Sequence, residues 1–365
     1  MPAKATPVLL PSLDLADAAA AAAAGVAAGG RLSRVEMRRL VEAVLTGGLD
    51  SPAAEEAFGR LLVALAERGE AATEIAGAAE ALRARMRPLS ARGIVADTCG
   101  TGGDGSGSFN ISTAAAIVAA AAGVPVAKHG NRSVTSRTGS ADVLEALGVR
   151  IDLDAASVAA CLEETGLAFC HAPHHHPTMA RVAAIRRAVG RPTVFNLVGP
   201  LCNPAGASVQ VIGVGRPALR EPLAAAAALL GLPRAVVVTG GLGDSGKCLD
   251  ELSLFGPTEV VDVSPAGIVR HRWTPEDFGL PRRPTEEIAL LAVDGPQQSA
   301  AAIRRVFAGE TGPSRDVVVL NAAAVLLAAG RADDPPSAAR LAAEAIDTAA
   351  AARKLEQLAL RSQAG

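Results

Sequence analysis

The chain reads Asp97-Thr-Cys-Gly-Thr-Gly-Gly-Asp-Gly-Ser-Gly-Ser-Phe-Asn-Ile-Ser-Thr113 between a short β-type run, Ile94 to Asp97, and a helical pattern from Ser112 to Ala122. Five glycines lie between residues 100 and 107, more than the one or two that a tight turn requires. Glycine lets the main chain adopt positive φ and approach a ligand closely, and the N-terminus of the following helix favours anions. The stretch therefore predicts a loop whose backbone N–H groups bind phosphate.

Strand and helix signals alternate on both sides of this loop. A second strand is predicted over Val124 to Ala127, and a helix over Ala141 to Leu147. Further buried strands are predicted at Val209 to Val214, Ala235 to Val238, Glu259 to Val263 and Val317 to Leu320, and closing helices at Ala322 to Leu327 and Leu341 to Leu358. Such alternation is typical of an α/β domain with a mostly parallel central sheet flanked by helices.

The N-terminal part has a different, purely helical pattern. Apolar residues follow helical spacing from Met37 to Val44 and again from Phe58 to Leu65. The expected organisation is an Ala-rich extension over residues 1–30, a small all-helical domain over 31–92, and an α/β domain over 93–175 and 204–365.

Composition excludes several classes of protein. The 365 residues are 50% hydrophobic and 20% charged, as in an ordinary globular protein, with a formal net charge of -2 and only 2% aromatic residues. The chain has neither an excess of basic residues nor enough aromatic residues to stack on bases, so its composition does not indicate nucleic-acid binding. The five cysteines contain no Cys-x-x-Cys pair, which favours the cytoplasm over a disulfide framework or a thiolate zinc site. Because no apolar stretch reaches the ~18 residues of a membrane span, we expect no membrane partner.

A second polar loop follows the strand Val124 to Ala127 and reads Lys128-His-Gly-Asn-Arg-Ser-Val-Thr-Ser-Arg-Thr-Gly-Ser-Ala-Asp142. Its cations Lys128, Arg132 and Arg137 suit phosphate, and strand carboxyl ends are where open α/β sheets bind ligands. Gly100 to Gly105 also fits the dinucleotide pattern G-x-G-x-x-G, but that pattern expects an acidic residue ~20 positions on. Lys128 and His129 occupy that region, which counts against NAD and excludes NADP less strongly. Two consecutive phosphate-type loops favour a diphosphate or a phosphorylated sugar.

An acidic pair, Asp250 and Glu251, follows the strand Ala235 to Val238 and a Gly-rich turn. Carboxylate pairs suit Mg²⁺, which completes its coordination shell with water and substrate phosphate. Alone, such a pair is more often a helix start, and only the neighbouring loops favour a metal site. The preceding Gly241-Leu-Gly-Asp-Ser-Gly-Lys-Cys248 nearly matches a Walker A loop, but Cys248 replaces the required hydroxyl residue and no clear helix follows.

Four histidines lie within six residues in His171-Ala-Pro-His-His-His176. Zinc is the less favoured interpretation, because two prolines stiffen the segment and no cysteine or carboxylate completes a known spacing. A single substrate-facing histidine is favoured instead. Arg186 is predicted on a helix about two turns beyond Met179, where it could pair with a substrate carboxylate.

These stretches together resemble the anthranilate phosphoribosyltransferase family from about Arg31 to the C-terminus. The shared strings are Gly100-Thr-Gly-Gly-Asp104, Asn110-Ile-Ser-Thr113, Gly139-Ser-Ala-Asp-Val-Leu-Glu-Ala-Leu147, Ala172-Pro with His176-Pro, Phe195-Asn-Leu with Gly199-Pro and Asn203-Pro, and Leu249-Asp-Glu251. The resemblance implies a homodimer formed through the helical domain, which segment 176–203 would rejoin. It also implies the Mg²⁺-dependent transfer of a phosphoribosyl group from 5-phosphoribosyl 1-diphosphate to anthranilate, in tryptophan biosynthesis.

The resemblance also assigns site residues. Donor binding falls to Gly100, Gly103, Asp104, Ser108, Asn110, Ile111, Ser112, Thr113, Lys128, Asn131, Arg132, Ser136 and Ser140. Acceptor binding falls to Gly100, His129, Asn131, Pro173, His176 and Arg186, with Arg186 facing the anthranilate carboxylate. Magnesium falls to Ser112, Asp250 and Glu251. No general base is assigned, since an aromatic amine is neutral and nucleophilic at pH 7.

Two other classes compete with this interpretation. A nucleoside phosphorylase of the same fold would lack the acceptor pair Asn131 and Arg186. A non-catalytic, nucleic-acid-binding relative would show basic stripes and degraded donor loops, whereas the loops here are whole. One departure from the family concerns the metal site: Gly240 to Lys247 followed by Cys248 replaces a shorter turn, which leaves the placement of Asp250 and Glu251 open.

Overall fold

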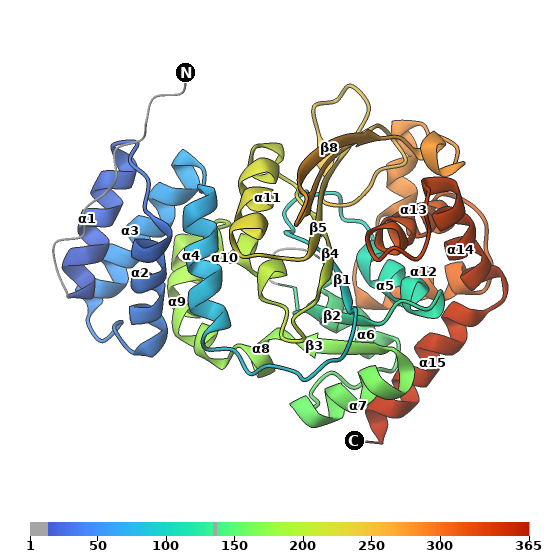
Figure 1. Cartoon of the computed structure of the whole chain (residues 1–365), viewed down its shortest axis with the longest axis horizontal. Helices are drawn as coiled ribbons and strands as arrows, with labels where there is room; N and C mark the ends of the chain where they lie inside the picture. Colours follow the sequence, from blue (N-terminus) through green and yellow to red (C-terminus); the bar gives the residue numbers. More distant parts are fainter. Residues whose placement is uncertain (1–13, 134–136, 365) are drawn as a thin grey trace. The chain divides into compact units, whose positions relative to one another are not determined.

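The computed structural model describes residues 14–133 and 137–364, and these form two compact units (Figure 1). The helical unit contains the described residues up to Arg87 together with His176–Cys202 and Glu221–Gly231. The α/β unit contains Pro88–His175, Asn203–Arg220 and the described residues from Leu232 onward. Glu221–Gly231, which was expected in the α/β domain, thus belongs to the helical unit.

The helical unit consists of amphipathic helices that bury their apolar faces against one another. α1 packs on α3, α2 packs on α4, and α9 packs on α3. The helices of this unit are α1 (Leu15–Ala27), α2 (Arg34–Thr46), α3 (Pro52–Arg68), α4 (Ala72–Arg83), α9 (Ala180–Val189) and α10 (Val194–Val198), with all but the first residue of α11 (Arg220–Leu229).

The described part of the Ala-rich segment, which was expected to be an extension of the helical domain, contains a regular helix, α1. Asp14 caps α1 by accepting hydrogen bonds from the backbone of Ala16 and Asp17. The buried side chains of α1 recur with helical spacing and are mostly alanine, from Leu15 to Val26. Because alanine keeps the helix surface shallow, α1 packs directly on α3 and forms part of the helical unit.

The α/β unit is built on one sheet with the strand order β3-β2-β1-β4-β5-β7-β8, and β6 pairs with β5. Strands β1 to β5 pair in parallel, whereas β6, β7 and β8 are antiparallel to their neighbours. The predicted mostly parallel sheet is therefore confirmed. The strands are β1 (Ala96–Gly100), β2 (Val126–Gly130), β3 (Leu167–His171), β4 (Val209–Gly213), β5 (Arg234–Gly241), β6 (Cys248–Leu249), β7 (Thr258–Ser264) and β8 (Gly267–Trp273).

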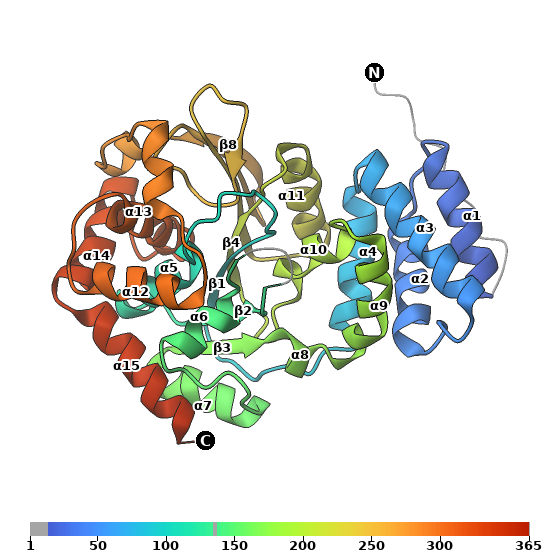
Figure 2. The same ribbon diagram turned by 180° about the vertical axis from the view of Figure 1, so that it is seen from behind.

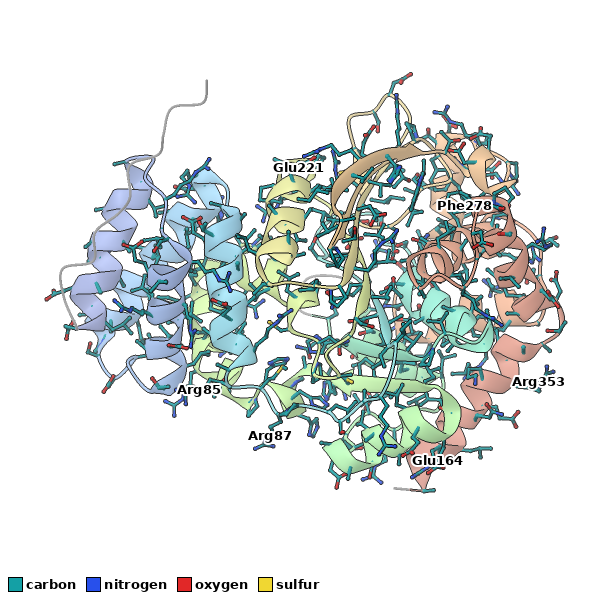
Figure 3. All side chains as sticks on the ribbon, viewed as in Figure 1. Arg85, Arg87, Glu164, Glu221, Phe278 and Arg353 are labelled. Carbon is teal, nitrogen blue, oxygen red and sulfur yellow. The ribbon has the colours of Figure 1, made fainter. Side chains whose placement is uncertain are left out.

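Helices α5, α12, α13 and α14 lie on the same side of this sheet (Figures 1 and 2). α7 and α15 pack at its β3 edge. Figure 3 labels Glu164 on α7, whose carboxylate accepts a hydrogen bond from Arg361 of α15 at 2.8 Å. The helices of this unit are α5 (Ile111–Ala121), α6 (Ser140–Ala146), α7 (Ala155–Thr165), α8 (Ala172–His175), α12 (Pro296–Phe307), α13 (Pro313–Ala328), α14 (Pro335–Asp347) and α15 (Ala350–Gln363).

The predicted strand Val317 to Leu320 is wrong, because these residues lie in the middle of α13. Every residue of α13 from Asp316 to Leu326 is buried, since the helix packs against α5, α14 and the sheet. A helix that is apolar on all sides loses its 3.6-residue periodicity, and a short valine run then reads equally well as a strand.

Three strands were not predicted from the sequence. β3 is buried, but it is only five residues long, lies directly between two helices and has no β-branched residue. β6 has only two residues, and β8 is an exposed edge strand with charged side chains. Within the described ranges, no helix is both long and apolar enough to cross a membrane.

Candidate functional site

The predicted phosphate loops start at one edge of the sheet. β1, β2 and β4 are mutually parallel and end at Gly100, Gly130 and Gly213. The glycine-dense loop leads from β1 into α5, and the Lys128 loop leads from β2 towards α6. Carboxyl ends of parallel strands are the usual ligand-binding edge of an open α/β sheet. The loops thus lie where a phosphorylated ligand binds in such folds.

The acidic pair reaches this edge because two strand ends are glycine. A Cβ at Gly100 would lie 2.1 Å from Asp250 Oδ2, and a Cβ at Gly213 would lie 1.6 Å from the Asp250 carbonyl oxygen. Any other residue at either position would displace the acidic segment from the strand ends.

Both acidic side chains accept a hydrogen bond from that loop or from the helix after it. The Gly102 amide donates to Asp250 Oδ2 at 2.7 Å, and the Ser112 amide donates to Glu251 Oε1 at 3.0 Å. Both acidic side chains thus contact the start of the first loop or of α5. Its Cys248 lies in β6 and donates to the Gly215 carbonyl at 2.9 Å. The Walker A resemblance is accidental, because a strand and not a helix follows the turn.

Three carboxyl groups, those of Asp104, Asp250 and Glu251, lie close together at this edge of the sheet. Burial, followed by the nearby charge of Asp104, raises the pKa of Asp250 to about 7. Burial and the charge of Asp250 hold the pKa of Glu251 well above its usual range. A cluster of half-buried carboxyl groups that resists ionisation is stabilised when a cation binds, because the cation offsets both desolvation and mutual repulsion.

Lys128 brings a positive charge to the acidic cluster. Its ammonium group is buried and donates to the Thr98 carbonyl at 2.7 Å and to Ser112 Oγ at 3.3 Å. Asp97 lies underneath, fully buried, and accepts hydrogen bonds from the His129 amide and from Asn203. Lys128 is thus held at the start of α5, beside the acidic pair.

The first loop presents further groups that suit a phosphate. Gly102 and Gly103 both have positive φ, so their amides do not follow a regular strand or helix. The Thr113 hydroxyl, in the first turn of α5, is buried and has no hydrogen-bond partner among the described residues. Asp104 Oδ1 accepts hydrogen bonds from the amide and the hydroxyl of Ser106, both at 3.0 Å, and Ser106 Oγ lies 3.2 Å from Ser108 Oγ. Ile111 is buried in the first turn of α5.

The second loop is held by a residue that was not assigned from the sequence. Asp142 Oδ2 accepts hydrogen bonds from the amides of Ser133 and Gly139, both at 2.9 Å. Asp142 thereby holds together the two ends of a segment whose central residues 134–136, including the predicted Ser136, lie outside the described residues. Its position three residues after Gly139, in the first turn of α6, was the available signal.

Arg132, predicted to bind the donor, has acidic partners of its own. Its guanidinium donates to both carboxylate oxygens of Glu145, at 2.5 and 2.8 Å, and to Asp142 at 3.1 Å. These partners, Glu145 first, raise the pKa of Arg132. Arg132 thus contributes to the conformation of the loop. Asn131 accepts from the Arg132 amide, and Ser140 donates to the Asn131 carbonyl at 3.4 Å.

The predicted acceptor residues are divided between the units. Gly100, His129, Asn131 and Pro173 belong to the α/β unit, while His176 and Arg186 belong to the helical unit. Arg186 lies on α9, as predicted, and its guanidinium lies 6.0 Å from the ring centroid of Phe195. Burial lowers its pKa, and no carboxylate among the described residues pairs with it. His176 Nε2 lies 3.0 Å from the Cys202 carbonyl.

The histidine run does not form a metal centre. No group of three histidine, cysteine or acidic side chains within the described ranges could hold a metal ion by itself. The His171 ring stacks on Phe169 and contacts the His174 ring, with centroids 6.1 and 5.3 Å apart. The acidic pair is different in kind, since Mg²⁺ takes only one or two protein carboxylates and otherwise uses water and phosphate oxygens.

Fold and site together define an α/β protein that binds a phosphorylated ligand and carries a helical unit. Two family models agree with this class. Residues 92–352 match the description "Glycosyl transferase family, a/b domain", and residues 21–86 match "Glycosyl transferase family, helical bundle domain". The second match begins inside α1, consistent with the packing of that helix on α3.

Individual relatives narrow the family. An anthranilate phosphoribosyltransferase from Rhodopirellula baltica is 46% identical over 350 residues, which cover 96% of this chain and 98% of the relative. The crystal structure of the anthranilate phosphoribosyltransferase from Thermus thermophilus is 42% identical, with a TM-score of 0.84 over 94% of this chain and 99% of that one. The chain therefore belongs to the anthranilate phosphoribosyltransferase family.

A more distant structure bears on ligands. The Saccharomyces cerevisiae anthranilate phosphoribosyltransferase in complex with PRPP and Mg is 27% identical, with a TM-score of 0.82 over 91% of this chain and 94% of that one. The same yeast enzyme has also been solved in complex with 4-fluoroanthranilate.

Proposed function

We propose that this protein transfers the 5-phosphoribosyl group of 5-phosphoribosyl 1-diphosphate (PRPP) to the amine of anthranilate, releasing diphosphate and N-(5-phosphoribosyl)anthranilate, in a Mg²⁺-dependent step of tryptophan biosynthesis. One observation carries the proposal. Asp250 and Glu251 each accept a hydrogen bond from the glycine-dense loop or from α5, so a divalent ion and a diphosphate can share one strand edge. Membership of the family and the yeast complex with PRPP and Mg support it.

The residues fit Mg²⁺ as a bound cofactor. Asp250, Glu251 and the Ser112 hydroxyl supply hard oxygen ligands at a site where burial raises the pKa of both carboxyl groups. A divalent cation bound there would neutralise charge on the departing diphosphate.

The protein's own groups act on the same leaving group. The amides of the first loop, the N-terminus of α5 and the buried Lys128 ammonium are fixed before the ligand arrives, so they stabilise developing negative charge without reorganising. Asn110, Ser112 and Thr113 add donors from the start of α5. Positioning and electrostatics therefore supply the catalysis, and no general base is required.

For the acceptor, Arg186 is the strongest candidate. It is a half-buried cation without a carboxylate partner among the described residues, and a carboxylate ligand would offset its burial. We propose that it pairs with the anthranilate carboxylate, and that His129, Asn131, Pro173 and His176 contact the ring and the amine. This pairing distinguishes the transferase from a nucleoside phosphorylase, which has no acceptor carboxylate to bind.

The test is to mix the purified protein with PRPP, Mg²⁺ and anthranilate and to follow the loss of anthranilate fluorescence. We expect a loss that depends on all three components. Phosphorolysis of a nucleoside without transfer to anthranilate would favour the phosphorylase alternative. Binding of nucleic acid without either reaction would favour the non-catalytic alternative.

We further propose that the enzyme is a cytoplasmic homodimer. All five cysteines are free thiols, as a reducing compartment requires. Within the helical unit, α1, α3 and α9 line a groove of about 950 Å³ whose apolar lining is mostly alanine, including Ala20, Ala24 and Ala188, with Gly59 beside them. Such small residues let a second copy approach closely. Sedimentation of the Gly59→Arg variant checks this, since a monomer is expected where the parent protein is a dimer.

A further inference from the structure

Ser299 is a fully buried serine outside every predicted site, yet its hydroxyl contacts a predicted donor-binding residue. It lies in the first turns of α12 and is 0% exposed. The backbone amide of Asn110 donates to Ser299 Oγ at 3.0 Å, and Ser299 Oγ donates to Asn110 Oδ1 at 2.7 Å. The two residues are 189 positions apart in the chain.

Ser299 uses its hydroxyl both as an acceptor and as a donor towards Asn110. One lone pair of Ser299 Oγ accepts the Asn110 backbone N–H, and its single proton is donated to the side-chain oxygen of Asn110. Thr138 Oγ1 donates to the same oxygen at 3.1 Å. Both lone pairs of Asn110 Oδ1 are thus engaged by hydroxyl groups.

This arrangement sets which end of the Asn110 side-chain amide is available to a ligand. Its nitrogen, Nδ2, has two protons, and one of them is donated to the Thr138 carbonyl at 3.4 Å. The other proton can be donated to a ligand. A flipped amide would present an oxygen instead, and an oxygen would repel the oxygens of a phosphate.

α12 is held in register on the donor loop by main-chain hydrogen bonds. The Val293 amide donates to the Gly107 carbonyl at 2.9 Å, and the Phe109 amide donates to the Leu291 carbonyl at 2.8 Å. These bonds fasten the segment just before α12 to the end of the glycine-dense loop. These main-chain hydrogen bonds therefore position Ser299 next to Asn110.

We propose that Ser299 is a positioning residue for the donor substrate: it holds the side-chain amide of Asn110 with an N–H group free to bind the diphosphate of PRPP. The proposal rests on the proposed function, because it concerns the donor of that reaction. Ser299 itself does not touch the substrate.

The test compares Ser299→Ala with Ser362→Ala. Ser362 is a matched control, since it is also 0% exposed, accepts the Arg150 amide at 2.9 Å and donates to the Ala359 carbonyl at 2.7 Å. Both substitutions remove a buried hydroxyl and lower Tm. We expect only Ser299→Ala to raise the KM for PRPP, by about tenfold, with the KM for anthranilate within about twofold of the parent value.

A double-mutant cycle with Asn110→Ala sharpens the test. Once the side-chain amide is absent, adding Ser299→Ala should raise the KM for PRPP by less than about twofold. Equal effects of Ser299→Ala in the presence and absence of Asn110 would overturn the proposal, as would a fall in Tm with an unchanged KM for PRPP. If the parent enzyme shows no transfer, the proposed function fails, and calorimetric titration of the same variants with PRPP still decides on Ser299.

Discussion

Each unit contains a glutamate that accepts main-chain hydrogen bonds, but the two glutamates, one buried and one half-buried, have different partners. Glu74 of the helical unit is 0% exposed, accepts hydrogen bonds from the amides of Leu32 at 2.9 Å and Ala71 at 2.7 Å, and is paired with Arg68. Glu251 of the α/β unit accepts one main-chain hydrogen bond, from the Ser112 amide, and the nearby charge of Asp250 raises its pKa further. A fully partnered acid stabilises a fold, whereas an acid crowded by other acids is retained for what it binds.

The same difference separates two arginines of the helical unit. Arg68 donates to the carbonyls of Gly30 and Gly69 and pairs with Glu74, so its charge is fully satisfied. Arg186 lies beside the ring of Phe195 and forms no salt bridge with a carboxylate of the described residues, and burial lowers its pKa. The number of hydrogen-bond and ion-pair partners therefore distinguishes charged residues that stabilise the fold from those that are candidates for binding a ligand.

The largest expected effect is on activity, from Glu251→Gln. Glutamine keeps the oxygen that accepts from the Ser112 amide but loses the charge, so we expect kcat/KM to fall about 100- to 1,000-fold while the metal-free protein becomes no less stable. Steady-state kinetics across a Mg²⁺ titration and Tm without Mg²⁺ measure both. An active variant with normal Mg²⁺ dependence would remove Glu251 from the metal site.

Glu74→Gln should do the opposite. Removing the charge leaves Arg68 without its partner, and we expect the free energy of unfolding to fall by about 3 kcal/mol with kcat of the remaining folded enzyme unchanged. Denaturant titration checks the first part. Glu56→Gln is the control, because Glu56 pairs with Arg60 at the surface and should change stability by less than about 0.5 kcal/mol. Equal effects of the two substitutions would contradict the comparison.

The third expectation concerns pH. The pKa of Asp250 is about 7 in the folded protein and about 3.9 in an unfolded chain, so between these values the folded state binds the extra proton. Its contribution to stability is thus complete at low pH and is lost as pH rises towards 7. Relative to Asp250→Asn, the metal-free protein should lose about 2 kcal/mol or more between pH 4 and pH 8.

Unfolding followed by the fluorescence of Trp273, the sole tryptophan, measures this difference. Added Mg²⁺ should restore stability more at pH 8 than at pH 5, since the ion binds the ionised pair. Parallel stability curves for the two proteins across this range would show that Asp250 ionises normally.

The smallest effect is expected from Arg186→Ala. Losing a charged hydrogen bond to the acceptor carboxylate should raise the KM for anthranilate about tenfold and leave the KM for PRPP unchanged. Arg187→Ala, which alters the exposed neighbour on the same helix, should change neither. Equal rises in both KM values for Arg186→Ala would place Arg186 away from the acceptor.

Much of the fold was accessible from local patterns. The central strands β1, β2, β4, β5 and β7 and the helix α5 were predicted within a few residues, because each has a distinct period or a Gly-rich boundary. α13 was misread at Val317 to Leu320, since burial on all sides removes the periodic signal. The packing of α1 was missed for a related reason: an alanine-rich helix has little contrast between its faces.

The sequence alone determined the chemistry that the protein can offer: a glycine-dense loop, a lysine after the next strand and an adjacent acid pair are local facts of composition and order. Tertiary structure decided which of those groups meet. Asp250 reaches Gly102, and Ser299 reaches Asn110 across 189 positions, because strands and helices distant in sequence are packed at one edge of a sheet. Burial and mutual repulsion, which raise the pKa of Asp250 and Glu251, arise only from that packing.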